Sequence, residues 1–296
     1  MKSKPLISIV TPSFNQAQFL ESTIESILSQ NYSNLEYIII DGGSTDGSVN
    51  IIKKYEKYLH FWCSEPDNGQ YDAINKGFRY STGEIMTWLN SDDMYLPWAF
   101  KTVADIMSTL PNIEWLTTFS PAGWDYQGFC SGFSSIPGYS LAAFLDGCYL
   151  PSSSKALGYI QQESTFWHRN LWDKSGGYLR TDINLASDFD LWSRFYIHAD
   201  LYGTSSPLGG FRSQCNQRSR NIEEYVREAE LSLSTMRQSL KWKPHLLRNI
   251  LLAIKVRKIP KIREIMVDKW GYIGKKVVRE KSDYPDSYWE MKDSWF

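Results

Sequence analysis

Short, nearly continuous apolar runs recur along the first 120 residues, each followed by polar residues. The runs cover residues 6–11, 35–40, 60–63, 85–89 and 113–118. A run without polar alternation is typical of a strand buried on both faces, as in a parallel sheet. Apolar residues at helical spacing predict helices over 17–29, 47–57 and 71–80. Strands that alternate with helices in this way predict an α/β fold with a mostly parallel, doubly wound sheet.

The rest of the chain is less regular. Residues 120–160 are rich in Gly, Ser, Pro and aromatic residues, which predicts loops or short hairpins. Residues 163–169 and 206–211 read as extended, and 187–197 as a helix. From residue 222 the pattern predicts helices, broken near Pro244 and Pro260 because proline interrupts helical hydrogen bonding.

Two of the apolar strands end in acidic clusters, YIIIDGGSTDG over 37–47 and EIMTWLNSDD over 84–93. In open α/β sheets, ligands bind in the crevice beyond the carboxyl ends of the strands. Asp92 and Asp93 would be hard oxygen ligands for a divalent metal whose other ligands come from a phosphate. Asp41 and Asp46 flank a glycine pair that lets a ligand approach the backbone. Asp, Gly and Ser also fill ordinary turns, but two such clusters on one sheet favour a binding site.

Length and composition limit the class of protein further. The chain has 296 residues, 42% of them hydrophobic, which is ample for a sizeable core. The four cysteines, at 63, 130, 148 and 215, have no C-x-x-C spacing, so they indicate neither a zinc site nor a disulfide scaffold and fit a reducing cytoplasm. The basic start and short apolar stretch at the N-terminus make a poor signal peptide. No apolar run approaches the roughly 20 residues that a membrane span needs.

The net charge of −1 hides an asymmetry. Residues 1–240 carry 18 basic and 26 acidic side chains, whereas residues 241–281 carry 13 and 3. This basic stretch is interleaved with apolar residues, which suits a helix on an anionic membrane leaflet with Leu246, Leu247, Ile250, Leu251 and Ile254 inserted. It also suits a helical appendage packed on the rest of the protein with a solvated basic face. Nucleic-acid binding is unsupported because residues 1–240 are acidic.

Five motifs in order carry a family resemblance: SIVTPSFNQAQFLESTIESILSQ, YIIIDGGSTDGS, SEPDNGQYDAINKGFRYSTGEI, WLNSDD, and QESTFWHRNLWDKSGGYL followed by ASDFDLWSR. Over about residues 6–218 the chain resembles the family 2 glycosyltransferases, enzymes of the GT-A fold that use nucleotide-activated sugars. Within the family it looks most like bacterial enzymes that build surface polysaccharides and O-antigens. The resemblance implies a catalytic domain over 1–220, with a nucleotide-sugar half to about 118 and an acceptor half from about 119. A helical, basic extension over 221–296 would follow.

The resemblance also implies roles for individual residues on the donor side. The nucleotide sugar, with UDP or dTDP as the expected carrier, would be bound by Thr11, Pro12, Asp41, Gly69, Gln70, Asp72 and Asp92. Asp93 would ligate the divalent metal, Mn²⁺ or Mg²⁺, that bridges the diphosphate. Asn90 stands where some relatives have another acid, so the metal contribution of this loop rests mainly on Asp93. Ile74 stands where some relatives have an arginine close to the base.

The expected catalytic base lies at the start of the helix over 187–197, where the family's glutamate-aspartate motif aligns with Ser187 and Asp188. Ser187 resembles a helix N-cap, and Asp190 would then be its capping-box partner. Asp188, in the first turn, would be held ionised by the helix dipole, as a base must be. We therefore prefer Asp188 to Asp190. Arg212 could steady the diphosphate bidentately, or belong to an exposed basic loop.

These residues predict an inverting, metal-dependent glycosyltransferase that acts on a glycan or lipid-linked acceptor, with residues 120–160 supplying much of the acceptor recognition. Its expected location is the cytoplasm, at the inner face of the cell membrane if the basic stretch binds lipid. A sugar-1-phosphate nucleotidyltransferase is an alternative, but residues 11–15 lack the glycine-rich phosphate loop with arginine and lysine expected of one. A non-catalytic glycan-binding relative is another, which the acids at 93 and 188 disfavour.

Overall fold

The computed structural model describes residues 4–151, 153–215, 217–254, 259–281 and 287–295. The strands of the main sheet are β1 (Ile7–Ser13), β2 (Leu35–Asp41), β3 (Phe61–Ser64), β4 (Ile85–Trp88), β6 (Trp115–Thr118), β9 (Phe166–His168), β10 (Leu201–Thr204), β12 (Ile273–Lys281) and β13 (Ser287–Trp295). Their order in space is β13-β12-β10-β6-β9-β4-β1-β2-β3. Strands β1 to β4 are mutually parallel, whereas β9 runs antiparallel between β4 and β6. The predicted α/β fold with a mostly parallel sheet is confirmed.

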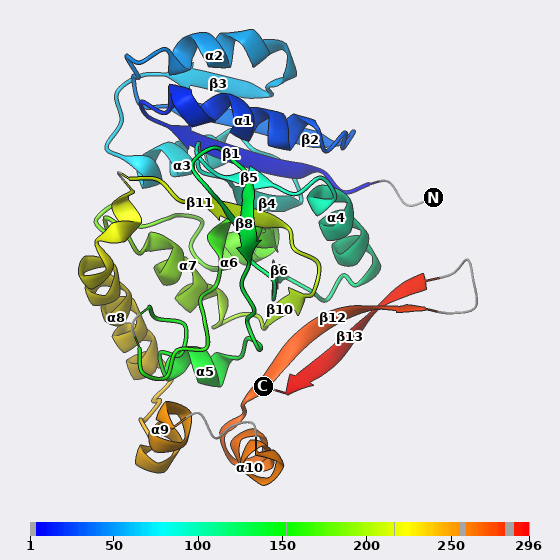
Figure 1. Cartoon of the computed structure of the whole chain (residues 1–296), viewed down its shortest axis with the longest axis vertical. Coiled ribbons are helices and arrows are strands. Elements are labelled where there is room, and N and C mark those ends of the chain that lie inside the picture. Colours follow the sequence, from blue (N-terminus) through cyan, green and yellow to red (C-terminus); the bar gives the residue numbers. More distant parts are fainter. Residues whose placement is uncertain (1–3, 152, 216, 255–258, 282–286, 296) are drawn as a thin grey trace.

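Helices cover both faces of this sheet (Figure 1). On one face lie α1 (Ala17–Leu28), α2 (Ser48–Tyr55) and α4 (Ala99–Thr109); on the other lie α3 (Gln70–Arg79), α6 (Arg169–Lys174) and α7 (Ser187–Phe195). Successive side chains of β1 alternate between the two cores, because Ile9 packs with the first set of helices and Val10 with the second. The buried apolar runs of the sequence arise from this double covering.

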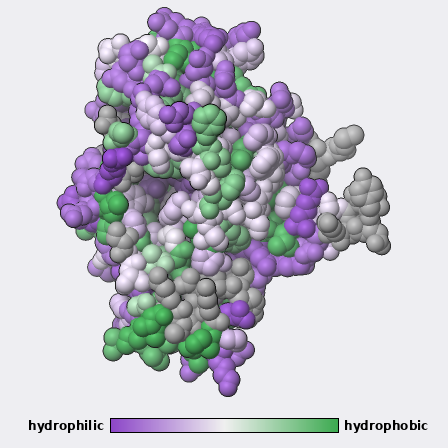
Figure 2. Space-filling view, in the orientation of Figure 1, coloured by the Kyte–Doolittle hydropathy of each residue, from purple (hydrophilic) through white to green (hydrophobic). Residues whose placement is uncertain are grey.

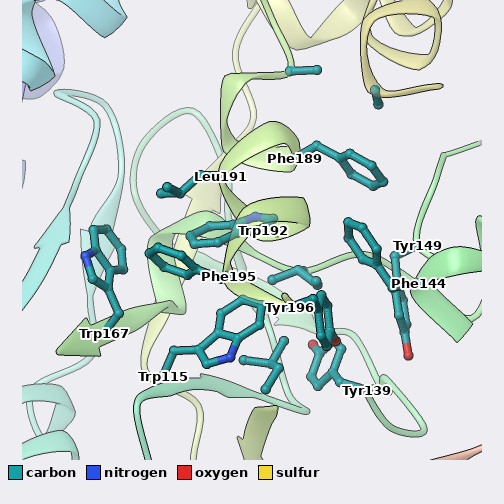
Figure 3. Close-up of a cluster of buried hydrophobic side chains, with 14 of the residues drawn as sticks. Trp115, Tyr139, Phe144, Tyr149, Trp167, Phe189, Leu191, Trp192, Phe195 and Tyr196 are labelled. Carbon is teal, nitrogen blue, oxygen red and sulfur yellow. The ribbon is translucent and has the colours of Figure 1, made fainter. Parts of the chain in front are cut away.

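Buried aromatic side chains fix the rotation of α7 (Figure 3). Trp192 of α7 stacks on Trp88 at the end of β4, with ring centroids 6.1 Å apart, and on Trp115 of β6 at 5.6 Å. Phe189, one turn earlier on α7, stacks on Phe144 at 4.6 Å. Residues three apart share one face of a helix, so these contacts turn that face into the core. Asp188 immediately precedes Phe189 and lies in the first turn of this fixed helix.

A second, small sheet and several short helices complete the fold, and some of these elements fall within residues 120–160, where the sequence predicted loops or short hairpins. Its strands are β5 (Met94–Tyr95), β11 (Gly209–Arg212), β7 (Ala122–Trp124) and β8 (Cys130–Phe133), and β7 and β8 form the kind of short hairpin that the sequence predicted. The short helices are η1 (Glu56–Tyr58), α5 (Leu141–Leu145), η2 (Gln162–Ser164) and η3 (Arg218–Arg220). Of these elements, β11, η2 and η3 contribute residues near the carboxyl ends of the central strands.

The end of the chain differs from the predicted helical extension. Helices α8 (Ile222–Ser239), α9 (Leu246–Ala253) and α10 (Pro260–Trp270) are present, but residues 273–281 and 287–295 form an antiparallel hairpin. Strand β12 of this hairpin pairs in parallel with β10 and so extends the main sheet. Apolar residues of α8, α9 and α10 also share the core that contains α7. The described residues after 220 are thus packed into the same body as those before it.

Candidate functional site

A pocket of about 830 Å³ opens beyond the carboxyl ends of β1, β2, β3 and β4. This volume lies within the usual range for ligand pockets of roughly 300–1,000 Å³. Its walls come from the strand ends, the start of α3, η2, the start of α7, the segment after β11 and α8. The residues that line it are Pro12, Ser13, Phe14, Gln16, Gly42, Pro66, Asp67, Gly69, Gln70, Tyr71, Ala73, Trp88, Asn90, Ser91, Asp92, Gln162, Glu163, Asn184, Leu185, Asp188, Phe211, Gln214, Gln217, Arg218 and Tyr225.

The predicted site residues fall into two groups. Pro12, Gly69, Gln70, Asp92 and Asp188 line the pocket. Thr11, Asp41, Asp72, Asp93 and Arg212 are not in its lining, and their polar atoms bond to neighbouring parts of the protein instead. The predicted residues therefore come from segments around the pocket, and they divide between those that face it and those whose contacts support its walls.

Asp41 supports the turn that follows β2. Its carboxylate is buried and accepts hydrogen bonds from the backbone N–H groups of Gly43 (3.1 Å) and Ser44 (2.8 Å) and from Ser64 Oγ (2.7 Å). Gly42 of this turn lines the pocket, and a Cβ atom there would lie 2.9 Å from Asp67 Oδ2. The glycine therefore allows the backbone and an acid of the opposite wall to approach each other closely.

Thr11 and Asp72 have comparable supporting contacts. Thr11 Oγ1 is buried and accepts a hydrogen bond from the hydroxyl of Tyr37 at 3.2 Å. Asp72, in the first turn of α3, accepts one from the backbone N–H of Asn68 at 3.1 Å. Gly69, which precedes α3, has a φ of 106°, in the left-handed region that favours glycine. The Asp72 contact and the Gly69 conformation define how the chain enters α3 beside the pocket, whereas the Thr11 contact joins β1 to β2.

Acidic side chains crowd the loop after β4. Asp92 lines the pocket, and burial raises its pKa. Asp93 is fully buried, and burial together with the charges of Asp92 and Glu163 raises its pKa well above the usual range. Burial also raises the pKa of Glu163, which lines the pocket from η2, to about 7. Three carboxyl groups thus lie close together, with the guanidinium group of Arg212 as a nearby positive charge.

Arg212 holds this acidic loop in place. Its backbone N–H donates to Asp93 Oδ1 at 2.8 Å and its Nε to the carbonyl oxygen of Asp92 at 2.6 Å. Its two terminal nitrogens donate to the carbonyl oxygen of Tyr126 and to Ser22 Oγ. The guanidinium group is therefore neither the diphosphate ligand that lines the pocket nor the exposed basic loop that the sequence suggested. It is buried and anchors the loop.

A chain of hydrogen bonds crosses from the segment after β11 to the acidic loop. Arg218, an exposed residue that lines the pocket, donates to Gln70 Oε1 at 3.0 Å. Gln70 in turn donates to Asn90 Oδ1 at 2.6 Å, and Asn90 to Asp93 Oδ2 at 3.1 Å. Arg218 is therefore the basic side chain of this segment that is placed to meet an anionic ligand.

Asp188 and Asp190 have different environments. Asp188 is half-buried in the pocket wall, and burial raises the pKa of its carboxyl to about 6. Asp190 faces away from the pocket: it accepts from Arg194 Nε at 2.9 Å and from Ser232 Oγ at 3.1 Å. The predicted capping box is wrong, because α7 begins at Ser187 itself and the Ser187 hydroxyl has no hydrogen-bond partner among the described residues. Asp190 is instead a structural ion-pair partner.

Several pocket residues were not singled out from the sequence. Asp67, Gln162, Glu163 and Tyr225 are polar side chains of the walls, and Phe14 is an aromatic side chain with 59% of its surface exposed. An exposed aromatic ring at a pocket is suited to stack on a nucleobase. Asp67, Glu163 and Phe14 lie inside the quoted motifs, which was the available signal. Tyr225 lies beyond them, and nothing in the sequence pointed to it.

The residues present fit a divalent cation that shares its ligands with a substrate. Among the described residues, no three His, Cys, Asp or Glu side chains are arranged to hold a metal by themselves. Asp92 and Asp93 nevertheless offer hard oxygen donors where carboxylates repel one another. Mg²⁺ and similar ions typically bind through one or two carboxylates together with substrate phosphates and water. The donor set thus suits such an ion only when a phosphorylated ligand completes it.

The fold is shared with solved structures that hold nucleotide sugars. In the Staphylococcus aureus TarS 1–349 complex with UDP-GlcNAc, the matching fold has a TM-score of 0.62 at 14% identity, over 89% of this chain and 73% of that one. The mannosyltransferase PcManGT of Pyrobaculum calidifontis, in complex with GDP-Man and Mn²⁺, matches with a TM-score of 0.51 at 15% identity. The match covers 91% of this chain and 83% of that one.

Sequence comparisons identify the family. The model of glycosyl transferase family 2 matches residues 8–120. An uncharacterized glycosyltransferase of Mycobacterium tuberculosis is 32% identical over 191 residues, which cover 64% of this chain and 68% of that protein. The glycosyltransferase TuaG of Bacillus subtilis, named for teichuronic acid biosynthesis, is 38% identical over 95 residues, 31% and 38% of the two chains. The chain belongs to glycosyl transferase family 2.

Proposed function

We propose that this glycosyltransferase moves a sugar from a nucleoside diphosphate donor to a hydroxyl of a saccharide or lipid-linked saccharide, with inversion at the anomeric carbon and with a divalent metal, Mn²⁺ or Mg²⁺. The observation that carries the proposal is that Asp92 of the acidic loop and Asp188 of α7 line one pocket of suitable volume. One acid lies where a diphosphate and its cation would bind, and another is available for the acceptor.

Asp188 is the proposed general base. It would take the proton of the acceptor hydroxyl as that oxygen attacks the anomeric carbon from the face opposite the diphosphate. A base of this kind typically contributes about 10²–10⁴-fold to the rate. Because its pKa is about 6, the Asp188 carboxyl is largely ionised at neutral pH and still basic enough to accept a proton. No second nucleophile is invoked, so the single displacement inverts the configuration.

The donor would lie along the opposite wall. Phe14 and Pro12 would contact the nucleobase, and Gln70 and Arg218 the sugar and diphosphate, because all four residues line the pocket. Asp93 and Asp92 would hold the cation, which when bound neutralises the diphosphate and acts as a Lewis acid toward the leaving oxygen. Arg212 keeps both acids in register through its bonds to Asp93 and to the Asp92 carbonyl.

We further propose a role in surface polysaccharide synthesis, at the cytoplasmic face of a membrane. The name of the relative TuaG supports the polysaccharide part. For the membrane part, Leu246, Leu247 and Ile254 on and after α9 expose 77%, 53% and 59% of their surface. Figure 2 shows hydrophobic residues gathered at this end of the molecule. Exposed basic side chains lie on both sides of α9 in the sequence, at Lys241, Lys243, Lys261, Arg263 and Lys269. Apolar and basic groups together suit an anionic bilayer.

The same stretch also contacts the protein. Arg248 and Leu252 of α9 and Met266 of α10 are buried. The two interpretations of the basic stretch are therefore compatible, with one side packed and the other available to lipid. Lys255, Arg257 and Lys258 lie outside the described residues. No helix among the described segments has the length and hydropathy needed to cross a bilayer.

The proposal is tested first with a panel of nucleotide sugars. UDP-GlcNAc, UDP-glucose, dTDP-glucose and GDP-mannose are incubated with the full chain and Mn²⁺, and nucleoside diphosphate release is measured. For the best donor, Asp188→Asn should lower kcat by about 10²–10⁴-fold and leave UDP binding by calorimetry nearly unchanged, because the base contacts the acceptor side. Asp190→Asn is the matched control and should mainly lower the melting temperature. An active Asp188→Asn with a folded, inactive Asp190→Asn would reverse the assignment.

A further inference from the structure

Helix α8 presents three polar side chains to the start of α7. Tyr225, Glu228 and Ser232 are spaced i, i+3 and i+7, so they share one face of α8. Each forms a hydrogen bond with the segment that carries Asp188. From the sequence this helix was expected to lie in the extension outside the catalytic domain. Its contacts place it instead at the pocket wall, which Tyr225 itself lines.

Glu228 fixes the backbone that leads into α7. Its carboxylate is 8% exposed and accepts three successive backbone N–H groups, those of Asn184 (3.0 Å), Leu185 (2.8 Å) and Ala186 (3.1 Å). The first N–H groups of a helix and its approach lack intrahelical partners, and a side chain normally satisfies them. Ala186, at the N-cap position, has no side-chain oxygen, and no side-chain cap is present there. The acid from α8 instead binds the three backbone N–H groups just before the first turn, and its negative charge at this end complements the helix dipole.

Tyr225 holds the carboxylate of Asp188. Its hydroxyl lies 3.4 Å from both oxygens of that group. Ser232, two turns further along α8, donates to Asp190 Oδ1 at 3.1 Å and so ties down the next turn of α7. One helix thereby fixes the backbone before the proposed base, the orientation of its carboxylate and the turn that follows.

We infer that α8 is a positioning helix for the proposed base, with Glu228 fixing the start of α7 and Tyr225 orienting the Asp188 carboxylate. The inference rests on the proposed function, because it assumes that Asp188 accepts the proton. Glu228 acts through α7 and is a positioning residue, not a catalytic one. The base and the helix that aims it come from two segments about forty residues apart in the sequence.

The arrangement has a consequence for pH dependence. Burial raises the pKa of Asp188 to about 6, and the hydrogen bond from Tyr225 opposes that rise. The charged and titratable groups around this site are Tyr71 of α3, Glu163 of η2, Arg218 of η3, and Tyr225 and Glu228 of α8. Removing the Tyr225 hydroxyl removes a hydrogen bond that lowers the pKa of Asp188. The pKa should therefore rise, and Asp188 should keep its proton to a higher pH. In the pH profile of kcat, the midpoint on the acidic side should then move to a higher pH by about half a unit.

The test compares Tyr225→Phe, Glu228→Gln and Asp188→Asn in the full chain, using hydrolysis of the donor selected from the nucleotide-sugar panel. Wild type should lose half of its kcat near pH 6. Tyr225→Phe should shift that midpoint upward and keep KM within about twofold, because the substrate-binding groups are intact. Glu228→Gln should lower kcat by about tenfold or more through misplacement of the base, with UDP affinity unchanged.

Tyr139→Phe is the matched control, because Tyr139 is another buried tyrosine whose hydroxyl donates a hydrogen bond, here to the carbonyl oxygen of Thr118. It should lower the melting temperature without moving the pH midpoint. An inactive Asp188→Asn together with an unmoved midpoint in Tyr225→Phe and an unchanged kcat in Glu228→Gln would overturn the inference and leave the base assignment standing. An active Asp188→Asn would overturn the base assignment itself. If Glu228→Gln does not fold, the pH midpoint of Tyr225→Phe decides.

Discussion

Asp92 and Asp93 are neighbours in the chain, yet their carboxylates meet different surroundings. Asp92 lines the pocket, while Asp93 is buried and accepts hydrogen bonds from the Arg212 N–H and the Asn90 amide. Each carboxylate oxygen has a further lone pair, so neither contact prevents metal ligation. Because their surroundings differ, substitutions of Asp92 and of Asp93 should have different effects, although the two acids are adjacent in one motif.

Metal dependence should separate them. If Asp93 is the ligand, Asp93→Asn should raise the Mn²⁺ concentration for half-maximal rate by about 10–100-fold or more, since even a residue that only orients a ligand has an effect of that size. Asp92→Asn should change it less and mainly weaken donor binding. The measurement is the rate of nucleoside diphosphate release over a Mn²⁺ titration for both variants. A larger metal effect for Asp92→Asn would exchange the two roles.

At the scale of residues, the sequence predicted which segments border the pocket better than which side chains face it. Arg212 illustrates the difference. A guanidinium after a strand suits a diphosphate, but its use depends on which way the chain turns, and here the donors of Arg212 point to Tyr126, Ser22 and the Asp92 carbonyl. Asp188 was preferred partly because Asp190 was expected to cap the helix. Asp190 is indeed engaged elsewhere, but by Arg194 and Ser232. Ser232 and the partners of Arg212 are distant in sequence, so they leave no local sequence signal.

At the scale of elements, the strands buried on both faces were predictable because they are nearly continuous runs of apolar residues. Helix α4 was not predicted, since its N-cap position is Trp98 and no side chain caps it, so the usual start signal is missing. The hairpin of β12 and β13 was mistaken for helix because its lysines and arginines continue a basic helical stretch. Its alternation of side chains, as in the buried Val277 between partly exposed neighbours, is that of a strand.

Helix α9 is the element on which membrane contact is proposed to depend. The double variant Leu247→Ser and Ile254→Ser removes two exposed apolar side chains, each worth about 1.5–3 kcal/mol when buried. Binding to phosphatidylglycerol vesicles, followed by sedimentation, should fall by about tenfold or more, and high salt should weaken binding of the wild type. Leu231→Ser is the matched control, because Leu231 is 63% exposed but belongs to α8. Equal vesicle binding by all three proteins would contradict a lipid role for α9.

At the scale of the whole molecule, a buried ion pair joins the end of the chain to its middle. Arg248 of α9 and Asp146, the residue after α5, are 4% and 3% exposed and form a two-point contact, with one N–O distance of 2.7 Å. Tyr272 and Trp242 also donate to the Asp146 carboxylate. Three positions beyond residue 240 thus converge on one acid, which explains why the extension shares the core.

Removing one partner of this pair should destabilise the entire chain. Arg248→Met leaves the Asp146 charge buried without its guanidinium, which typically costs about 3–5 kcal/mol. The free energy of unfolding, measured in urea, should fall by that amount in a single transition if the extension and the sheet unfold together. Arg227→Met is the control: its side chain is 71% exposed and lies 3.7 Å from Glu224, so less than about 1 kcal/mol is expected. A separate early transition of the C-terminal part would indicate an independent unit.

The stacked indoles around α7 have an optical consequence. Trp88 lines the pocket and also belongs to a set of tryptophans whose rings lie 5.5 to 6.1 Å apart. Closely spaced indoles couple their electronic transitions, which gives strong signals in near-ultraviolet circular dichroism. A ligand that touches Trp88 changes one member of the set and hence the spectrum of all. If the donor binds in this pocket as proposed, the near-ultraviolet spectrum should report its occupancy without a label and before any acceptor is known.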